Sequence, residues 1–207
     1  MNRTLLATLA VLLAGVLAFG HLTQGFSVLT AEAARRQAVA RSPFRVPGLV
    51  GIDQRGARRS LVDPEDHRVA IVDFVYTRCT SICSVLGSSY QQLQAQVEKQ
   101  HLAGRIHLVT VSFDPEHDTP AVIADYGERL RAHPAVWTIL SPGDRDQLRL
   151  SLKAFGIVVT PAQNGQFVHN AAFHLVDQHG RLARIIDIDQ PQQAVAAARQ
   201  LDEDDTS

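Results

Sequence analysis

The sequence predicts an α/β domain with a central mixed sheet and helices on both faces. Two continuous apolar runs, at residues 69–76 and 106–113, are typical of strands buried on both faces. Each run is followed by a segment with helical periodicity, at residues 83–102 and 119–131. Strands that alternate with helices favour a partly parallel sheet that the helices cover.

The remaining elements extend this pattern towards both ends of the domain. Residues 44–52 and 58–61 predict an N-terminal hairpin around a turn at residues 53–56. The later elements are a strand, a helix, an antiparallel hairpin and a final helix, at residues 136–140, 144–155, 173–177 with 182–188, and 191–201. The second hairpin makes the sheet mixed.

The first 33 residues have the pattern of an export segment. Arg3 precedes an uncharged run over residues 4–30, whose apolar centre covers residues 5–19. Ala31-Glu32-Ala33 resembles a cleavage site, so a cleaved signal peptide and a retained membrane anchor both stay open. The protein is therefore expected to be exported to the bacterial periplasm or an equivalent compartment, anchored in the inner membrane.

Three further segments complete the predicted organisation. Residues 34–43 are polar and are expected to form a linker. Residues 44–201 form the folded domain. Residues 202–207 are expected to be a solvated acidic tail.

Composition excludes several functional classes. The 20 Lys and Arg residues are balanced by 21 Asp and Glu residues, so the chain lacks the basic surface of a nucleic-acid-binding protein. The chain holds 2 cysteines, and a disulfide between residues four positions apart would close almost no loop. The spacing of these cysteines is better explained by chemistry than by stabilisation.

The two cysteines, Cys79 and Cys83, lie where the first buried strand runs into a helix. Sites in α/β proteins form at the carboxyl ends of such strands. Side chains at positions i and i+4 share one helix face, and the helix N-terminus favours the thiolate form. Arg78 adds positive potential. A soft dithiolate of this kind suits Cu(I), zinc or an iron–sulfur cluster.

Two thiolates leave the coordination of a metal incomplete, so a histidine from another segment is expected. Of the 9 histidines, His169 and His174 remain after those in the export segment, in turns and at element ends are set aside. Asp114 is read as a turn-forming, helix-capping residue, with a role in orienting the site left open. Asp118 or Thr119 is expected to cap the helix that follows.

A carboxylate also interrupts the first buried strand. Asp73 is surrounded by apolar residues in the sequence, so it must be paired or protonated when buried. Both a proton-handling and a structural role stay open for it.

Three separated motifs occur in order within residues 44–190, namely VDFVYTRCTSIC, VTVSFDPEHDTP and VHNAAFHLVDQHG. Together and in this order they resemble the Sco family of copper-binding assembly factors for cytochrome c oxidase. The resemblance implies a thioredoxin-like fold and a copper site, for Cu(I) or Cu(II), of Cys79, Cys83 and His169. It also places His174 at a family position that is usually aromatic.

The chain departs from the family pattern beside the implied ligands. Thr80 and Ser84 follow the two cysteines where proline is usual, and Val168 precedes the histidine where aspartate is common. Neither departure removes a ligand.

The function implied by the resemblance is that of a copper chaperone rather than an enzyme. It would deliver copper to a copper-accepting subunit of cytochrome c oxidase. The alternative is a thiol–disulfide oxidoreductase in which Cys79 and Cys83 reduce the acceptor's cysteines. The C-x3-C spacing argues against this as the sole role, and so does the lack of a proline between Pro161 and Pro191.

A peroxidase similar to peroxiredoxins shares the layout of strand, cysteine and helix. It would need proline and threonine before a single reactive cysteine. Thr77-Arg78 does not supply them, so this class ranks below the other two.

Overall fold

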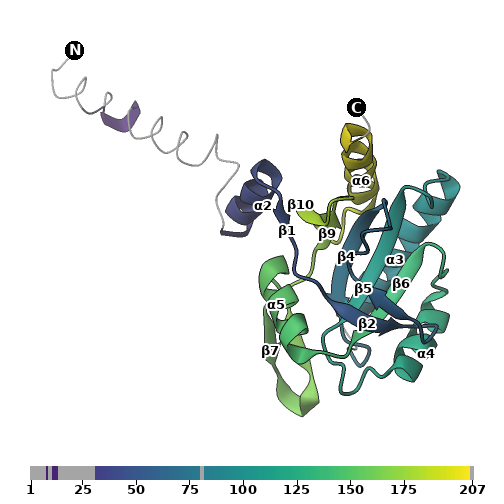
Figure 1. Ribbon diagram of the computed structural model, residues 1–207. Helices are drawn as coiled ribbons and strands as arrows, with labels where there is room; N and C mark the ends of the chain where they lie inside the picture. Colours follow the sequence, from purple (N-terminus) through teal and green to yellow (C-terminus); the bar gives the residue numbers. More distant parts are fainter. Residues whose placement is uncertain (1–7, 9–10, 14–30, 80–81, 206–207) are drawn as a thin grey trace. The chain divides into compact units, whose positions relative to one another are not determined.

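The computed structural model describes residues 8, 11–13, 31–79 and 82–205, with only the backbone for residues 82–86 (Figure 1). The chain divides into two compact units, residues 1–42 and 43–207. The export segment predicted for residues 1–33 lies largely outside the described residues. Within the part that the structure describes, no helix has the length and apolar character needed to cross a bilayer.

The first unit contains α2 (Ala31–Arg41), which covers most of the expected linker. Arg35 and Arg36 both bind the carboxylate of Glu32, at 3.3 and 3.1 Å. Pairs at spacings of three and four residues stabilise an exposed helix by a few tenths of a kcal/mol each, roughly 0.2–0.5. The segment is therefore helical, which its polar composition did not indicate.

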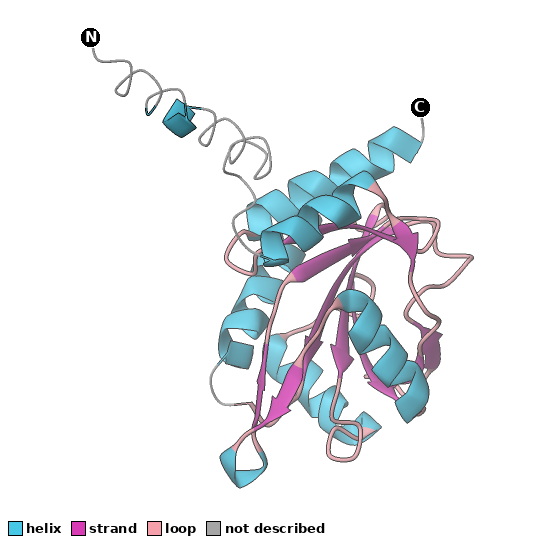
Figure 2. Ribbon diagram, turned by 90° about the vertical axis from the view of Figure 1, so that its left-hand side faces the viewer, coloured by secondary structure: helices cyan, strands magenta, loops and turns pink. Residues whose placement is uncertain are grey.

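The second unit is built on a mixed sheet (Figure 2). The described strands of this sheet number eight, in the order β1-β10-β9-β4-β5-β6-β2-β3. Their bounds are β1 (Phe44–Arg45), β2 (Val50–Asp53), β3 (Arg58–Ser60), β4 (Val69–Val75), β5 (Ile106–Ser112), β6 (Trp137–Pro142), β9 (Phe173–Val176) and β10 (Arg181–Ile186). Strands β4, β5 and β6 are parallel, while β9 joins β4 and β2 joins β6 in antiparallel register. The predicted mixed sheet is confirmed.

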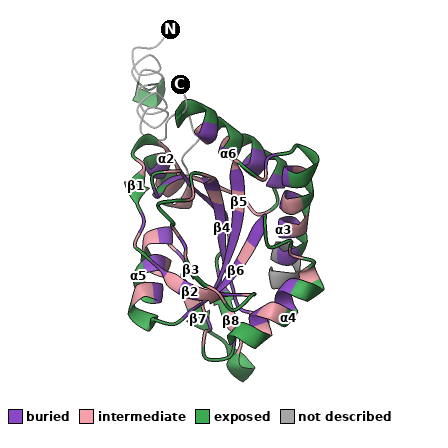
Figure 3. Ribbon diagram, turned by 45° about the vertical axis from the view of Figure 1, so that its right-hand side comes forward, coloured by how far each residue is buried: buried purple, intermediate pink, exposed green. Residues whose placement is uncertain are grey.

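Helices cover both faces of this sheet, as predicted. The main hydrophobic cluster lies under α3 (Ile82–Lys99), α4 (Pro120–Leu130) and α6 (Pro191–Asp205). The opposite face is covered by α5 (Arg145–Phe155), where Phe155 packs on Phe74 of β4 with ring centroids 5.0 Å apart. Figure 3 shows the resulting burial of β4 and β5 in the middle of the unit.

Residues 44–52, predicted as one strand, form two strands that lie towards opposite edges of the sheet. β1 pairs with β10 at one edge, whereas β2 pairs with β3 and β6 at the other. Pro47 lies between them and has no amide hydrogen to donate to a ladder, so it interrupts the pairing. The expected hairpin is formed by β2 and β3 only.

The acidic tail was predicted to begin at residue 202, but the chain is still helical there. α6 continues to Asp205, and Asp202 is 9% exposed. Its carboxylate binds the guanidinium of Arg105 and accepts a hydrogen bond from Gln178 at 3.1 Å. Because these partners come from distant segments, the acidic composition of residues 202–205 could not reveal that they are held in a helix.

Candidate metal centre

Cys79 lies at the carboxyl end of the parallel strands, four residues beyond β4. Its backbone N–H donates to the carbonyl of Tyr76 at 3.3 Å, which closes a turn before α3. The half-buried side chain packs against the hydrophobic cluster. The backbone of Cys83 lies in the first turn of α3, and its side chain is outside the described residues.

The turn that carries Cys79 is fixed by a buried carboxylate, Asp118. This side chain is fully buried and accepts hydrogen bonds from the backbone N–H and the hydroxyl of Thr77, at 3.0 and 2.5 Å. It also accepts from the hydroxyl of Ser112 at 2.6 Å. Thr119 rather than Asp118 caps α4, by accepting from Val122 N–H at 3.4 Å. Asp118 therefore joins the ends of β4 and β5.

Asp114 forms an ion pair with the residue that precedes Cys79. Its carboxylate lies 2.7 Å from Nη2 of Arg78 and 2.9 Å from Nδ1 of the half-exposed His117. The backbone carbonyl of Asp114 accepts hydrogen bonds from His117 and Asp118, which confirms the expected turn. A positive side chain is thus held beside the cysteine turn by a carboxylate that is itself 7% exposed.

His169 lies on a hairpin that sequence reasoning missed. The hairpin consists of β7 (Val159–Pro161), the 3-10 turn η1 (Gln163–Gly165) and β8 (Phe167–His169), with Val159 opposite His169. Asn164 and Gly165 have positive φ angles of 57° and 67°. An Asn-Gly pair between two runs with strand character is a strong hairpin signal, and it was available in the sequence.

Tyr76 attaches this hairpin to the strand that leads to Cys79. Its hydroxyl accepts a hydrogen bond from Phe167 N–H at 3.2 Å and lies 3.0 Å from Oε1 of Gln166, to which it can donate. The ring of Tyr76 also meets the ring of His169, with centroids 6.2 Å apart. The hairpin is therefore bound to a residue only three positions before Cys79.

His169 is buried in its neutral form with a defined tautomer. It is 7% exposed, and its ring packs edge-on against Phe113 at a centroid distance of 4.9 Å. Burial lowers the pKa of His169, although a hydrogen bond to the backbone of Asn170 acts in the opposite direction. Nδ1 lies 3.0 Å from the carbonyl of Asn170, which can only accept. Nδ1 therefore carries the proton, and Nε2 carries the lone pair that a metal needs.

Asn170 connects His169 to the end of α5. Its side-chain oxygen accepts from Val158 N–H at 2.7 Å, and its side-chain nitrogen donates to the carbonyl of Gly156 at 2.9 Å. Asn170 was not singled out in the sequence, because its partners lie 12 and 14 positions away. It fixes the backbone whose carbonyl orients the His169 ring.

His174, the other histidine considered from the sequence, lies in a different environment. It is 1% exposed on β9, and its ring packs edge-on against Phe155 and Phe74 at 5.3 and 6.3 Å. Its Nδ1 lies 3.4 Å from the carbonyl of Val72. His174 thus fills an aromatic position in the core below α5, whereas His169 packs beside the turn that leads to Cys79.

The donor set of the candidate centre is a thiol, an oriented neutral imidazole and the second cysteine of the α3 first turn. Such soft donors suit copper. Among residues with described side chains, no three His, Cys, Asp or Glu groups form a metal cluster by themselves, and the predicted set includes Cys83 from outside that part. The described donors are compatible with the predicted ligands.

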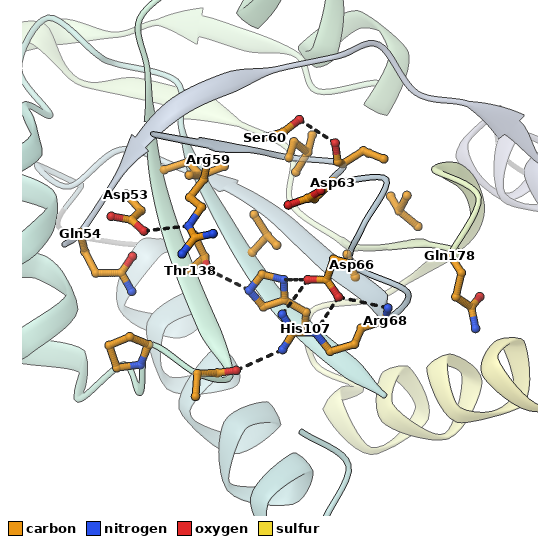
Figure 4. Close-up of a pocket in the computed structure, with 18 of the residues that line it drawn as sticks. Asp53, Gln54, Arg59, Ser60, Asp63, Asp66, Arg68, His107, Thr138 and Gln178 are labelled. Atoms are coloured by element: carbon orange, nitrogen blue, oxygen red, sulfur yellow. Dashed lines mark hydrogen bonds and ion pairs between the residues drawn. The ribbon is translucent and has the colours of Figure 1, made fainter. Parts of the chain in front are cut away.

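A separate cavity of about 190 Å³ lies near the amino ends of β4 and β5 (Figure 4). His107 binds the hydroxyl of Thr138 at 2.8 Å and lies 3.4 Å from the carboxylate of Asp66, which Arg68 holds at 2.6 Å. Burial lowers the pKa of His107. Although burial opposes it, hydrogen bonds from Arg68 and His107 hold the pKa of Asp66 well below its usual range. These polar groups bind one another near the amino ends of the strands, whereas Cys79 lies beyond the carboxyl end of β4.

Comparisons with known proteins identify the family of this chain. A family model described as SCO1/SenC matches residues 34–201. A curated relative, the SCO1 protein homolog of Bacillus subtilis (strain 168), is 26% identical over 118 residues, which cover 56% of this chain and 60% of that relative.

Solved structures with the same fold are also similar to this chain. A SCO1/SenC family lipoprotein from Bacillus anthracis str. Ames has a TM-score of 0.68 at 20% identity, covering 79% of this chain and 97% of that chain. BsSco, described with a disulfide switch and as a member of the Sco family of cytochrome c oxidase assembly proteins, has a TM-score of 0.67 at 19% identity, with 78% and 96% covered. Bradyrhizobium japonicum ScoI with copper bound has a TM-score of 0.58 at 20% identity, with 76% and 99% covered.

The structural likeness establishes the thioredoxin-like fold that the three sequence motifs imply. The family model covers most of the chain and includes both cysteines and His169. This protein therefore belongs to the SCO1/SenC family.

Proposed function

We propose that this protein binds copper through Cys79, Cys83 and His169 and delivers it to the copper centre of a cytochrome c oxidase subunit. The observation that carries the proposal is the orientation of His169. Its Nδ1 donates to the carbonyl of Asn170, so Nε2 is the ring nitrogen that carries the lone pair, which is the tautomer that binds metal. The hairpin that bears it is bound to Tyr76, near Cys79 in the chain.

The chain's own residues explain how such a site holds and releases its cargo. The N-terminus of α3 favours the thiolate form of cysteines in its first turn. Soft thiolates and an imidazole retain copper, while a three-ligand site leaves room for an incoming thiolate of the acceptor. Release then proceeds by exchange of ligands. Copper is thus the substrate that is transferred, and it is not a permanent cofactor of this protein.

The cellular setting belongs to the same proposal. The export pattern of residues 1–33 supports delivery outside the cytoplasm, at the membrane that holds the acceptor. Copper-bound structures in the family, such as Bradyrhizobium japonicum ScoI, support copper as the metal.

The test is a copper titration of the full-length, reduced protein in detergent. We expect one copper per chain and a thiolate-to-Cu(II) absorption band, both lost in Cys83→Ala and in His169→Ala. His133→Ala is the matched control, because its side chain is 60% exposed and lies near Glu98 rather than at the centre. Stoichiometric copper binding with an unchanged band in His169→Ala would overturn the ligand assignment.

A dithiol reductase is the second candidate. It is favoured by the position of Cys79 and Cys83 around a helix start, where a low thiol pKa promotes disulfide exchange. The same variants separate the two functions. A reductase keeps its rate of disulfide reduction in His169→Ala and loses it in Cys83→Ala, whereas a copper carrier loses its metal in both.

A further inference from the structure

A groove of about 730 Å³ adjoins the candidate metal centre between α5 and the residues that surround His169. Phe113 and Phe167 line it, and both rings also take part in the aromatic cluster of Tyr76 and His169. Asp114, which binds Arg78, lines the same end. One end of the groove therefore shares the rings of Phe113 and Phe167 with the aromatic cluster around His169.

The floor and one rim of the groove come from α5 and the turn after it. Leu148, Leu152 and Ile157 give an apolar floor. Val158 lines it too, with 65% of its surface exposed. An exposed apolar side chain at the edge of an apolar groove is typical of a surface that a partner covers.

A row of cations follows the apolar floor. Arg145, Arg149 and Lys153 are spaced by four residues, so they share one face of α5, and all three line the groove. Arg145 pairs with Glu116 and Arg149 with Asp146, but all four side chains are more than half exposed. Exposed ion pairs contribute about 0–1 kcal/mol, so these cations can exchange their partners for a ligand's carboxylates.

The groove is also connected to the orientation of His169. Gly156 and Val158, which line it, are both hydrogen-bonded to the side chain of Asn170. The carbonyl of Asn170 holds Nδ1 of His169. Contacts made in the groove thus act on the same short segment that positions a proposed ligand.

We propose that this groove docks an extended acidic segment of the copper acceptor, with apolar side chains on the floor and carboxylates against the cation row. The proposal rests on the proposed function, because it names the surface that receives the acceptor. The row of cations favours an acidic partner, and the apolar floor favours a partner that presents apolar side chains to it. The chain's own acidic residues 202–205 are held in α6, so they are not the occupant.

Docking at this position brings the acceptor's thiols to the end of the groove where Phe113 contacts the ring of His169. Binding of one segment converts ligand exchange into an intramolecular step with a high effective concentration. Attraction between the cation row and an acidic segment also accelerates the encounter, and the acceleration declines with salt. Specific transfer then does not require weak copper binding.

The experiment measures binding of the reduced, copper-free full-length protein to the soluble copper domain of the oxidase subunit from the same organism, by calorimetry. The variants are Arg149→Glu with Lys153→Glu, and separately Val158→Asp. We expect each to weaken binding by about tenfold or more, and the charge variant to lose the salt dependence of the wild type. Leu150→Asp is the matched control, because Leu150 is 52% exposed on α5 outside the groove.

The outcomes separate this proposal from the one on which it rests. Loss of docking in the groove variants with copper titration unchanged supports the groove and leaves the proposed function standing. Unchanged docking in both variants, or no docking of the wild type, overturns the groove even where copper binds. If the groove variants weaken docking but the wild type binds no copper, only the proposed function is overturned. Self-association of the wild type that the variants abolish assigns the groove to a second copy and overturns the acceptor.

Discussion

The carboxylate of Asp118 accepts two hydrogen bonds from Thr77, one from the backbone N–H at 3.0 Å and one from the hydroxyl at 2.5 Å. Thr77 lies two residues before Cys79, and Asp118 lies just before α4. A fully buried acid therefore sets the point at which the chain leaves β4 and enters the cysteine turn.

Replacing Asp118 with alanine is expected to destabilise the fold by about 2–4 kcal/mol, because it leaves the N–H of Thr77 and the buried hydroxyl of Ser112 without this acceptor. Thr77→Val is the control, since it removes only the hydroxyl and should cost about 1 kcal/mol. Urea unfolding measures both. Equal effects of the two substitutions would contradict the central role of the carboxylate.

Replacing Asn170 with alanine is expected to weaken copper binding by about tenfold without removing a ligand. The substitution breaks the bonds to Gly156 and Val158, so the carbonyl that orients His169 loses its fixed position. Loss of a partner that orients a ligand typically costs about 10–100-fold in affinity. Competition with a copper chelator measures the change. Asn170→Asp, which keeps the acceptor for Val158 N–H, should retain part of the affinity.

Asp73 predicts a pH-dependent effect on stability. Burial raises the pKa of Asp73 from its ordinary value to about 7. The folded protein therefore prefers the protonated form, and this contribution is complete below about pH 4 and is lost as the pH rises to about 7. Asp73→Asn should thus be more stable than the wild type at pH 8, by up to about 4 kcal/mol, and similar to it near pH 4. Chemical denaturation at both pH values tests this, and a difference independent of pH would refute it.

The buried His107 is expected to give the opposite pH dependence of stability. Its pKa is lowered by burial, so the folded state prefers the neutral ring. Stability should fall as the pH drops below about 6.5, the unfolded value, towards the lowered folded value. His107→Gln should flatten this part of the stability curve between pH 7 and pH 5, measured by thermal unfolding.

Local signals in the sequence predicted the elements that carry their own boundaries. Asp144 caps α5 by accepting from two backbone N–H groups, and Gly156 ends it in the left-handed region with φ of 66°. The run at residues 69–76 forms β4 at positions 69–75 because both of its faces meet apolar residues. Such features depend on neighbours in the chain, which is why periodicity and capping residues reveal them.

Structural features that depend on partners far away in the chain could not be predicted from local sequence signals. Asp118 reaches Thr77 across 41 positions, and Tyr76 reaches the His169 hairpin across 90 or more. The ligand assignment of His169 over His174 came from the family motifs, and the packing of His174 among aromatic rings is consistent with it. Pairings of this kind are decided by the tertiary fold, which no short window contains.

The outermost strands of the sheet are unusually short. β1 has 2 residues and β3 has 3, with Arg58 and Arg59 exposed on β3. Long uncharged edges recruit strands from other molecules and lead to aggregates, whereas short charged edges discourage it. The two short edges therefore oppose edge-to-edge pairing between copies of this protein.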